Sequence, residues 1–184
     1  MNVTPTAIPA VLLIAPTVHR DARGFFLETW EETRYAAHGI GPRFVQDNQS
    51  SSQRGTLRGL HAQLSSPQGK LVRAIRGEIL DVAVDGRPNS PTFGKWVSAL
   101  LTGDNHHQLW VPPGFFHGFA VLSETAEVAY KCSTPYARGD EIGVRWNDPA
   151  LGIDWQVAEP LLSAKDAAAP TLADVREKLA QAGW

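Results

Sequence analysis

The stretch EILDVAVDG at residues 78–86 decides the fold class of this 184-residue chain. Leu80, Val82 and Val84 fall on one side of an extended backbone, which is the two-residue period of a β-strand. The Asp-Gly pair at 85–86 then supplies the residues that a turn prefers. The stretch therefore predicts a buried strand that ends in a sharp turn.

Segments of the same kind recur on both sides of this strand, and the 16 glycines and 13 prolines are spread between them. The other expected strands are Phe25–Trp30, Leu57–Gln63, Leu71–Arg76, Gly94–Leu101, Gln108–Val111, His117–Leu122, Glu127–Cys132 and Ile142–Trp146. Helical periodicity is confined to Glu31–His38 and an amphipathic C-terminal segment, Leu172–Ala182. Many short strands and few helices predict an all-β sandwich or barrel of the jelly-roll kind, as a single domain over residues 1–184.

Composition narrows the classes of function. The formal net charge of −2 argues against binding to nucleic acid or to an acidic membrane by bulk electrostatics. Cys132 is the only cysteine, so neither an intramolecular disulfide nor a thiolate metal cage is expected. Apolar runs are too short for a membrane span, and a secretory signal pattern is absent from the N-terminus. We expect a cytoplasmic protein.

Two histidines and several cations are the candidates for chemistry. His61 lies in an expected strand, and His117 follows the Pro-Pro-Gly turn at 112–114. Arg58, Lys70 and Arg73 lie near them in a chain that is acidic overall. Taken alone, a strand histidine is more often a surface or structural residue, and cations on a sheet face are more often simply solvated. None of these signals is specific by itself.

Two histidines in a jelly roll also raise the possibility of a metal. The metal-binding cupin pattern is similar to Gly55 followed by His61, and to Pro112-x-Gly114-x-x-His117. That pattern requires a second histidine at the position of Gln63, and a nearby carboxylate is missing as well. Two histidines without a carboxylate do not complete the usual non-haem iron or zinc ligand sets. We therefore expect no metal and no cofactor.

A more specific signal comes from ordered sequence blocks along the chain. They are DARGFFLE at 21–28, FVQDN at 44–48, LRGLH at 57–61, GKLVR at 69–73, DVAVD at 81–85, SPTFG at 90–94, QLWVP at 108–112, GFFHGF at 114–119, YK at 130–131, WNDP at 146–149 and LSAKD at 162–166. In these blocks the chain resembles the dTDP-4-dehydrorhamnose 3,5-epimerase family over nearly its whole length. The resemblance implies a cupin-type jelly roll with short peripheral helices and a C-terminal helix.

The resemblance also implies a reaction and the residues that perform it. The reaction is epimerisation at C3 and C5 of dTDP-4-dehydro-6-deoxy-D-glucose, where a proton leaves as an enolate forms on the C4 oxygen. His61 matches the family's base, Asp166 its carboxylate partner and Tyr130 the general acid. A histidine suits the task because its ordinary pKa of about 6.5 lies near neutral pH.

Further residues match positions that bind the sugar nucleotide in the family. They are Arg23, Phe26, Glu28, Gln46, Asp47, Asn48, Arg58, Lys70, His117, Tyr136, Glu141 and Lys165. Among them, Lys70 is placed to stabilise the enolate oxygen, and Arg58 and Arg23 offer donor forks suited to the diphosphate. The segment that holds Arg23, Phe26 and Glu28 reaches the partner's pocket in the family, which implies a homodimer.

Several alternatives stay open on the sequence. They are a relative that epimerises C3 only, a metal-dependent cupin oxygenase, and a non-catalytic module that binds sugar nucleotides. Strict alternation puts Arg58 and His61 on opposite faces of their strand, unless Gly59 forms a bulge. Ala62 and Phe116 depart from the family pattern, and we expect both to reshape the sugar pocket.

Overall fold

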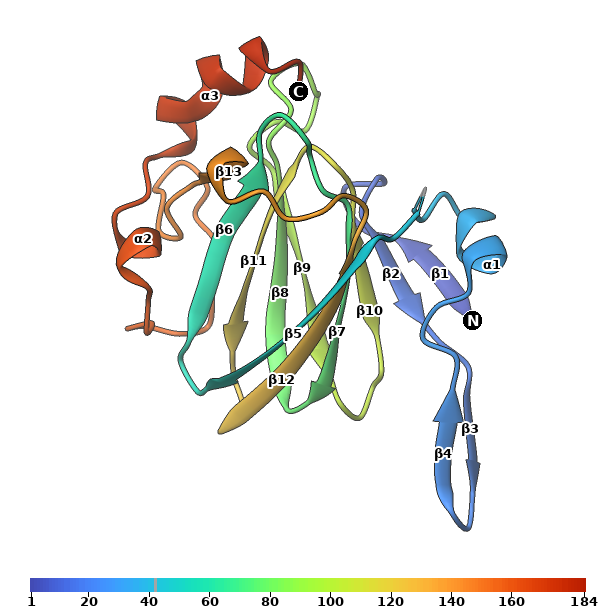
Figure 1. Cartoon of the computed structure of the whole chain (residues 1–184). Helices are drawn as coiled ribbons and strands as arrows, with labels where there is room; N and C mark the ends of the chain where they lie inside the picture. Colours follow the sequence, from blue (N-terminus) through green and yellow to red (C-terminus); the bar gives the residue numbers. More distant parts are fainter. Residues whose placement is uncertain (42) are drawn as a thin grey trace.

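Two antiparallel sheets face each other in the computed structural model, which describes residues 1–41 and 43–184. The first sheet has the order β1 (Asn2–Pro5), β2 (Leu12–Ala15), β10 (Gln108–Val111), β7 (Lys70–Arg76), β12 (Thr125–Cys132) and β5 (Gln46–Gln53). The second has the order β13 (Glu141–Gly143), β6 (Leu57–Gln63), β11 (Phe115–Val121), β8 (Glu78–Asp85) and β9 (Trp96–Thr102). This arrangement confirms the expected jelly roll (Figure 1).

Strand β8 shows why the fold forms. Ile79 and Ala83 face the other sheet and belong to the core between the two layers. Leu80, Val82 and Val84 point the opposite way and pack in a second core with residues of the C-terminal region. Because both faces of the strand are covered, it is apolar at nearly every position.

The second core lies on the outer face of the five-stranded sheet and includes residues of α3 (Leu172–Gln181). Figure 1 shows α3 at the upper left and α2 (Ala164–Ala167) beside β6. Leu172, Val175 and Leu179 of α3 are buried, as their spacing predicts. A capping box between Thr171 and Asp174 begins the helix. This layer fixes the position of α2, which carries Asp166.

A smaller helix, α1 (Glu32–Ala36), covers the outer face of the six-stranded sheet. Tyr35 of this helix is fully buried, and its hydroxyl donates to Gln108 Oε1 of β10 at 3.0 Å. None of the helices in the described part of the chain has the length and apolar character that crossing a bilayer would need.

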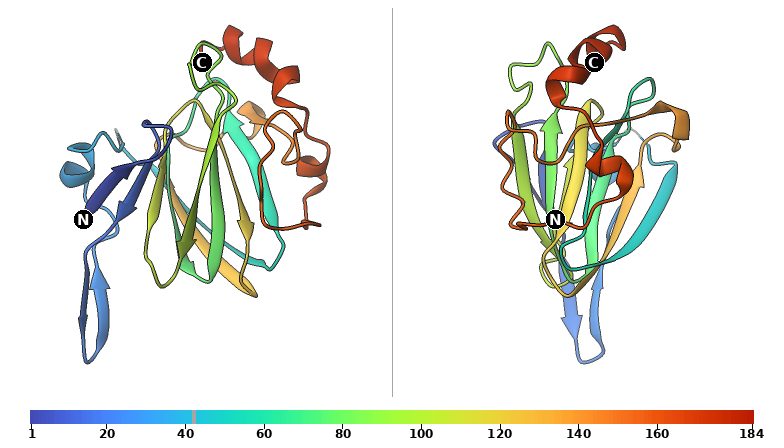
Figure 2. Two further views of the ribbon diagram at one scale, coloured as in Figure 1. Left: turned by 180° about the vertical axis from the view of Figure 1, so that it is seen from behind. Right: turned by 90° about the vertical axis from the view of Figure 1, so that its left-hand side faces the viewer.

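A two-stranded hairpin extends away from the sandwich. It consists of β3 (Val18–Asp21) and β4 (Gly24–Leu27), and both rotated views show it projecting beyond the sheets (Figure 2). Phe25 and Phe26 near its tip are 56% and 70% exposed. The arm therefore carries two adjacent large apolar side chains at the surface of the single chain.

The structure corrects several predicted boundaries. The expected strand Phe25–Trp30 ends at Leu27, and Trp30 instead packs edge-on against Phe44 with ring centroids 5.7 Å apart. The expected strand at 142–146 is the short β13, because Trp146 leaves the sheet and its carbonyl accepts from Trp155 Nε1 at 2.8 Å. Strands β1, β2, β3 and β5 were not predicted.

Candidate active site

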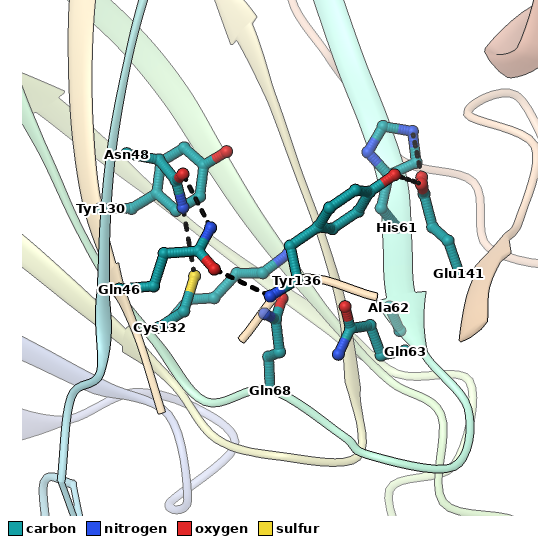
Figure 3. Close-up of a pocket in the computed structure, with 11 residues that line it drawn as sticks. Gln46, Asn48, His61, Ala62, Gln63, Gln68, Tyr130, Cys132, Tyr136 and Glu141 are labelled. Carbon is teal, nitrogen blue, oxygen red and sulfur yellow. Dashed lines mark hydrogen bonds and ion pairs between the residues drawn. The ribbon is translucent and has the colours of Figure 1, made fainter. Parts of the chain in front are cut away.

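An open space between the sheets holds most of the candidate residues. It consists of two adjoining cavities of about 280 Å³ and about 760 Å³. His61, Lys70, Tyr130, Tyr136 and Glu141 line both of them. Figure 3 shows the smaller cavity, with His61 and Glu141 on one wall and Tyr130 on the other.

A bulge in β6 brings Arg58 and His61 to the same space. His61 pairs with His117 and Arg58 pairs with Phe119, so two residues of β6 stand opposite Gly118 alone. Gly59 has φ +128°, and a Cβ there would lie 2.5 Å from the Cα of Gly118. Only glycine fits this close approach. The bulge that would reconcile Arg58 with His61 is therefore present, and both residues line the larger cavity.

His61 and Asp166 form a short hydrogen-bonded pair. Nε2 of His61 lies 2.5 Å from Oδ1 of Asp166, although the residues are 105 positions apart in the sequence. Burial alone would raise the pKa of Asp166, but the hydrogen bond and charge of His61, with Ser163 and the Gly59 backbone, hold that pKa below its usual range. An ionised carboxylate can only accept, so Nε2 of the neutral ring carries hydrogen and Nδ1 keeps the lone pair.

Two further groups on the six-stranded sheet face the same space. Burial lowers the pKa of the Lys70 ammonium, while the nearby Cys132, Asp81 and Glu141 oppose that shift. Burial also raises the pKa of the Tyr130 phenol. At neutral pH Tyr130 is therefore a protonated phenol that can donate a proton, whereas burial disfavours the charged form of Lys70.

Glu141 connects several groups at the mouth of the cavity. Its Oε1 accepts from Lys165 Nζ at 2.7 Å and lies 3.9 Å from His61 Nε2, and its Oε2 accepts from the Tyr136 hydroxyl at 2.9 Å. Burial would raise the pKa of Glu141, but the hydrogen bonds from Lys165 and Tyr136 and the charge of His61 keep it lowered. The Glu141 carboxylate thus holds the side chains of Lys165 and Tyr136 in place on the cavity wall beside His61.

A second histidine–carboxylate pair lies deeper. Nε2 of His117 is 2.7 Å from Oδ1 of Asp81, and both side chains are almost completely buried. Oδ2 of Asp81 is buried without a hydrogen-bond partner among the described residues. His117 lines the larger cavity and lies opposite His61 on the neighbouring strand.

The structure brings together most of the residues that the sequence singled out. Those that line at least one of the two cavities are His61, Tyr130, Asp166, Gln46, Asn48, Arg58, Lys70, His117, Tyr136, Glu141 and Lys165. Asp47 does not join them, because alternation along β5 turns it to the outer face, where it pairs with Lys131 at 2.9 Å.

The hairpin residues also lie away from the cavities of their own chain. Arg23 pairs with Asp21 at 2.5 Å, and its side chain is 90% exposed. Glu28 pairs with Arg34 at 3.0 Å, and Phe26 is exposed to solvent. In this chain alone, therefore, Arg23, Phe26 and Glu28 do not contribute to the site.

One expectation about the sugar pocket is wrong. Phe116 points away from the cavities into the second core, where its ring lies 5.6 Å from that of Trp184. Strand alternation places Phe116 on the face opposite His117. The size of its side chain therefore affects the packing of the C-terminal region and not the sugar pocket. Ala62 does line the smaller cavity.

Sequence reasoning missed residues whose role depends on tertiary contacts. Asp81 had a visible signal, since it is a charged residue within an apolar strand. Arg138, in the 3-10 turn η1 (Arg138–Asp140), adds a cation to the larger cavity, and nothing in its local sequence pointed there. Gln63 was noted only as a missing metal ligand, although its amide makes three hydrogen bonds.

The geometry does not favour a metal. No group of three or more His, Cys, Asp or Glu side chains is arranged to hold an ion within residues 1–41 and 43–184. The Nε2 atoms of His61 and His117 each contact a carboxylate, and the amide of Gln63 bonds to backbone. The arrangement instead offers a histidine–carboxylate pair and a phenol in one cavity of a jelly roll, and these are groups that can transfer protons.

Comparison with known proteins gives the family. A model of the dTDP-4-dehydrorhamnose 3,5-epimerase family matches residues 5–174, and the chain belongs to that family. It is 52% identical over 168 residues to the dTDP-4-dehydrorhamnose 3,5-epimerase of Shigella flexneri, covering 90% of this chain and 93% of that protein. It is 49% identical over 178 residues to the enzyme of the same name from Neisseria gonorrhoeae, covering 96% of this chain but only 54% of that protein's length.

Solved structures agree with the fold. The dTDP-6-deoxy-D-glucose-3,5-epimerase of Legionella pneumophila, in complex with dTDP-4-keto-L-rhamnose, superposes with a TM-score of 0.94 and 48% identity, covering 97% of this chain and 96% of that one. A 3'-monoepimerase of Streptomyces bikiniensis, in complex with dTDP-quinovose, superposes with a TM-score of 0.88 and 36% identity, covering 97% of this chain and 93% of that one. The proteins similar to this chain therefore include enzymes whose names differ in the number of centres that they invert.

Proposed function

We propose that this protein inverts C3 and C5 of dTDP-4-dehydro-6-deoxy-D-glucose and so supplies dTDP-4-dehydro-L-rhamnose for dTDP-L-rhamnose synthesis in the cytoplasm. The observation that carries the proposal is the 2.5 Å pair of His61 and Asp166, in a cavity that Tyr130 and Lys70 also line. The Legionella relative was solved with dTDP-4-keto-L-rhamnose, which is the product that we propose here.

The first step is removal of a proton from carbon. Nδ1 of His61 takes the proton from C3, the electrons of the C–H bond move into the C3–C4 bond, and the C4 carbonyl oxygen becomes an enolate. Asp166 stabilises the imidazolium that results, because its carboxylate accepts from Nε2. The ammonium of Lys70 offsets the negative charge on the enolate oxygen, and a fixed cation is more effective in a poorly solvated site.

The second step returns a proton to the opposite face. Tyr130 donates its hydroxyl hydrogen to C3 as the enolate collapses to the ketone, and solvent then restores the proton of Tyr130 and removes that of His61. The raised pKa of Tyr130 supports this role, since the phenol stays protonated at neutral pH. The same two groups act in the same way at C5.

The nucleotide requires its own cations. Arg58, Arg138 and Lys165 line the larger cavity, which is wide enough for more than a sugar. We infer that they bind the diphosphate, with Arg as the bidentate donor. Thus an acidic chain can hold an anionic ligand through a local cluster of positive charge.

We also propose a homodimer in which the projecting hairpin completes the partner's site. Arg23, Phe26 and Glu28 lie on this arm, and the 70% exposure of Phe26 leaves an apolar side chain without cover in one chain. Sedimentation should show a dimer. Mixing an arm variant, Arg23→Ala, with a chain that carries His61→Asn should restore activity, because each mixed dimer then contains one complete site.

Epimerisation at C3 alone is the second candidate, and the likeness to a 3'-monoepimerase favours it. Wild-type protein incubated with the 4-keto sugar nucleotide in deuterated water distinguishes the two. Deuterium at both C3 and C5, with a rhamno product by NMR, supports the proposal. Label and inversion at C3 only would select the second candidate, and label at neither carbon would leave a binding module.

No cofactor or metal enters this mechanism. The hydrogen bonds of Gln63 support that proposal, because its amide is engaged with backbone where a metal-binding cupin would place a ligand. Exhaustive chelation should leave turnover unchanged. Loss of turnover on chelation, with recovery when one particular metal is added back, would favour a metal-dependent cupin oxygenase instead.

A further inference from the structure

Three glutamine side chains converge on one short backbone segment beside the cavity. The segment is residues 134–137, which we call the tyrosine strap because it carries Tyr136. Gln68 Nε2 donates to the Thr134 carbonyl at 2.7 Å, and Gln63 Nε2 donates to the Pro135 carbonyl at 3.2 Å. On the other side, the backbone N–H of Tyr136 donates to Gln46 Oε1 at 2.8 Å, and that of Ala137 donates to Gln63 Oε1 at 2.7 Å.

These contacts are unusual for a surface connection. Pro135, Tyr136 and Ala137 are exposed, and water satisfies the backbone of most such loops. Here each of the four successive residues is instead held by a side chain from another part of the fold. Gln46 belongs to β5 and Gln63 to β6, while Gln68 lies between β6 and β7. The strap is therefore pinned to both sheets.

Gln63 is central to this arrangement. Its side chain is only 2% exposed, and Nε2 also donates to the Ser66 carbonyl at 3.0 Å. One amide therefore supplies two donated bonds and one accepted bond, which neither a carboxylate nor an apolar residue can do. The position that a metal-binding cupin would give to a ligand is used here to fix a loop.

The pinned segment forms part of the ligand site. Tyr136 lines both cavities, and its ring is about half exposed. Its hydroxyl donates to Glu141, which also approaches His61 (Figure 3). The carboxylate oxygen of Glu141 that approaches His61 also accepts from Lys165. A strap that moved outward would open this wall without displacing His61, which lies within a strand.

We propose that Gln46, Gln63 and Gln68 are positioning residues that keep the tyrosine strap closed, and that they set affinity for the sugar nucleotide through Tyr136. This inference rests on the proposed function for its kinetic consequence, whereas the closed strap itself is a property of the chain without ligand.

Gln63→Leu tests the kinetic part. It removes three hydrogen bonds and should raise KM on the order of tenfold, with kcat changed less than about threefold, because the base and acid stay in place. Gln68→Leu releases a single bond and should raise KM about threefold, which keeps the test available if the first variant does not fold. Gln181→Leu, on the exposed face of α3, is the matched control and should leave both constants unchanged.

A double mutant tests the route through Tyr136. Tyr136→Ala should itself raise KM, and adding Gln63→Leu to it should then have little further effect. Independent, multiplicative effects of the two changes on KM would overturn the proposal. So would a folded Gln63→Leu variant that lowers kcat while KM stays constant.

Limited trypsin digestion of the ligand-free protein separates this inference from the proposed function. Arg138 directly follows the strap and is exposed. Gln63→Leu and Gln68→Leu should speed cleavage after Arg138 several-fold relative to wild type and Gln181→Leu. Unchanged cleavage there would refute the closed strap, whether or not the protein epimerises sugars. Faster cleavage with no epimerisation by wild type would refute only the reaction.

Discussion

Replacing Asp166 by asparagine should reduce kcat by about 10³–10⁴-fold and change KM only a few-fold. The substitution keeps the shape of the side chain but removes its charge. An asparagine amide can also donate to Nε2 of His61, which would place the ring hydrogen on Nδ1 and block the base. The substrate contacts lie on other residues, so binding is affected much less than turnover.

The magnitude follows from the distance between the two side chains. At an effective dielectric constant of about 20, unit charges 2.5 Å apart attract by about 6–7 kcal/mol, which is an upper limit for the stabilisation of the imidazolium. His61 is 29% exposed, so water recovers part of this energy in the variant. A remaining loss of about 4–5.5 kcal/mol corresponds to the expected 10³–10⁴-fold.

The assay is steady-state turnover of the 4-keto sugar nucleotide, with folding of the variant checked by circular dichroism. Asp174→Asn is a suitable control, because Asp174 is an exposed carboxylate that caps α3 far from His61. A folded Asp166→Asn variant with kcat within tenfold of wild type would refute the pairing as the source of basicity.

Three other changes have expected outcomes. Tyr130→Phe should leave exchange of substrate protons faster than inversion, because abstraction continues without the opposite-face donor; NMR in deuterated water measures both, and equal loss of the two would remove Tyr130 from the mechanism. Lys70→Met should lower kcat about 10²–10³-fold. Burial lowers the pKa of Lys70 from the ordinary lysine value of 10.5. As the pH rises through this lowered pKa, Lys70 loses its charge and wild-type kcat should fall. The pH profile of the Lys70→Met variant should not show this fall. Asp85→Asn should lower the free energy of unfolding in urea at pH 7 by about 2–4 kcal/mol, because it removes the charge of a buried carboxylate that pairs with the half-buried Arg87. Burial would raise the pKa of Asp85, but its hydrogen bonds outweigh burial and lower that pKa in the folded protein. The contribution of Asp85 to the free energy of unfolding is therefore complete above the ordinary carboxyl pKa and is lost as the pH falls through the pKa of the folded state. A difference in stability between wild type and Asp85→Asn that does not depend on pH would contradict this.

The parts of the fold that the sequence predicted are those in which a local pattern reflects burial. Strand β8 is apolar at nearly every position because both its faces are covered, and the spacing of Leu172, Val175 and Leu179 matches one side of a helix. Strand β5 escaped prediction because its sequence, QDNQSSSQ, is polar throughout. Its inward side chains line the cavity rather than an apolar core. The strand therefore lacks the alternation of apolar and polar residues by which a strand is usually predicted.

The candidate site also contains features that a local sequence pattern could predict and others that it could not. A bulge at Gly59 could be foreseen from the conflict between Arg58 and His61, because glycine tolerates the geometry. The contact between His61 and Asp166 joins residues 105 positions apart, and only the resemblance to a family suggested it. The hydrogen bonds of Gln63 could not be foreseen at all, since they depend on where a distant loop lies.

The most direct test of the central claim is deuterium exchange at C3 and C5 by the His61→Asn variant. If His61 is the base at both carbons, exchange at the two positions should fall together in a folded variant, by at least the ~10²–10⁴-fold typical of a lost general base. Binding of dTDP, measured by calorimetry, should remain. Exchange at either carbon near the wild-type rate would contradict the account.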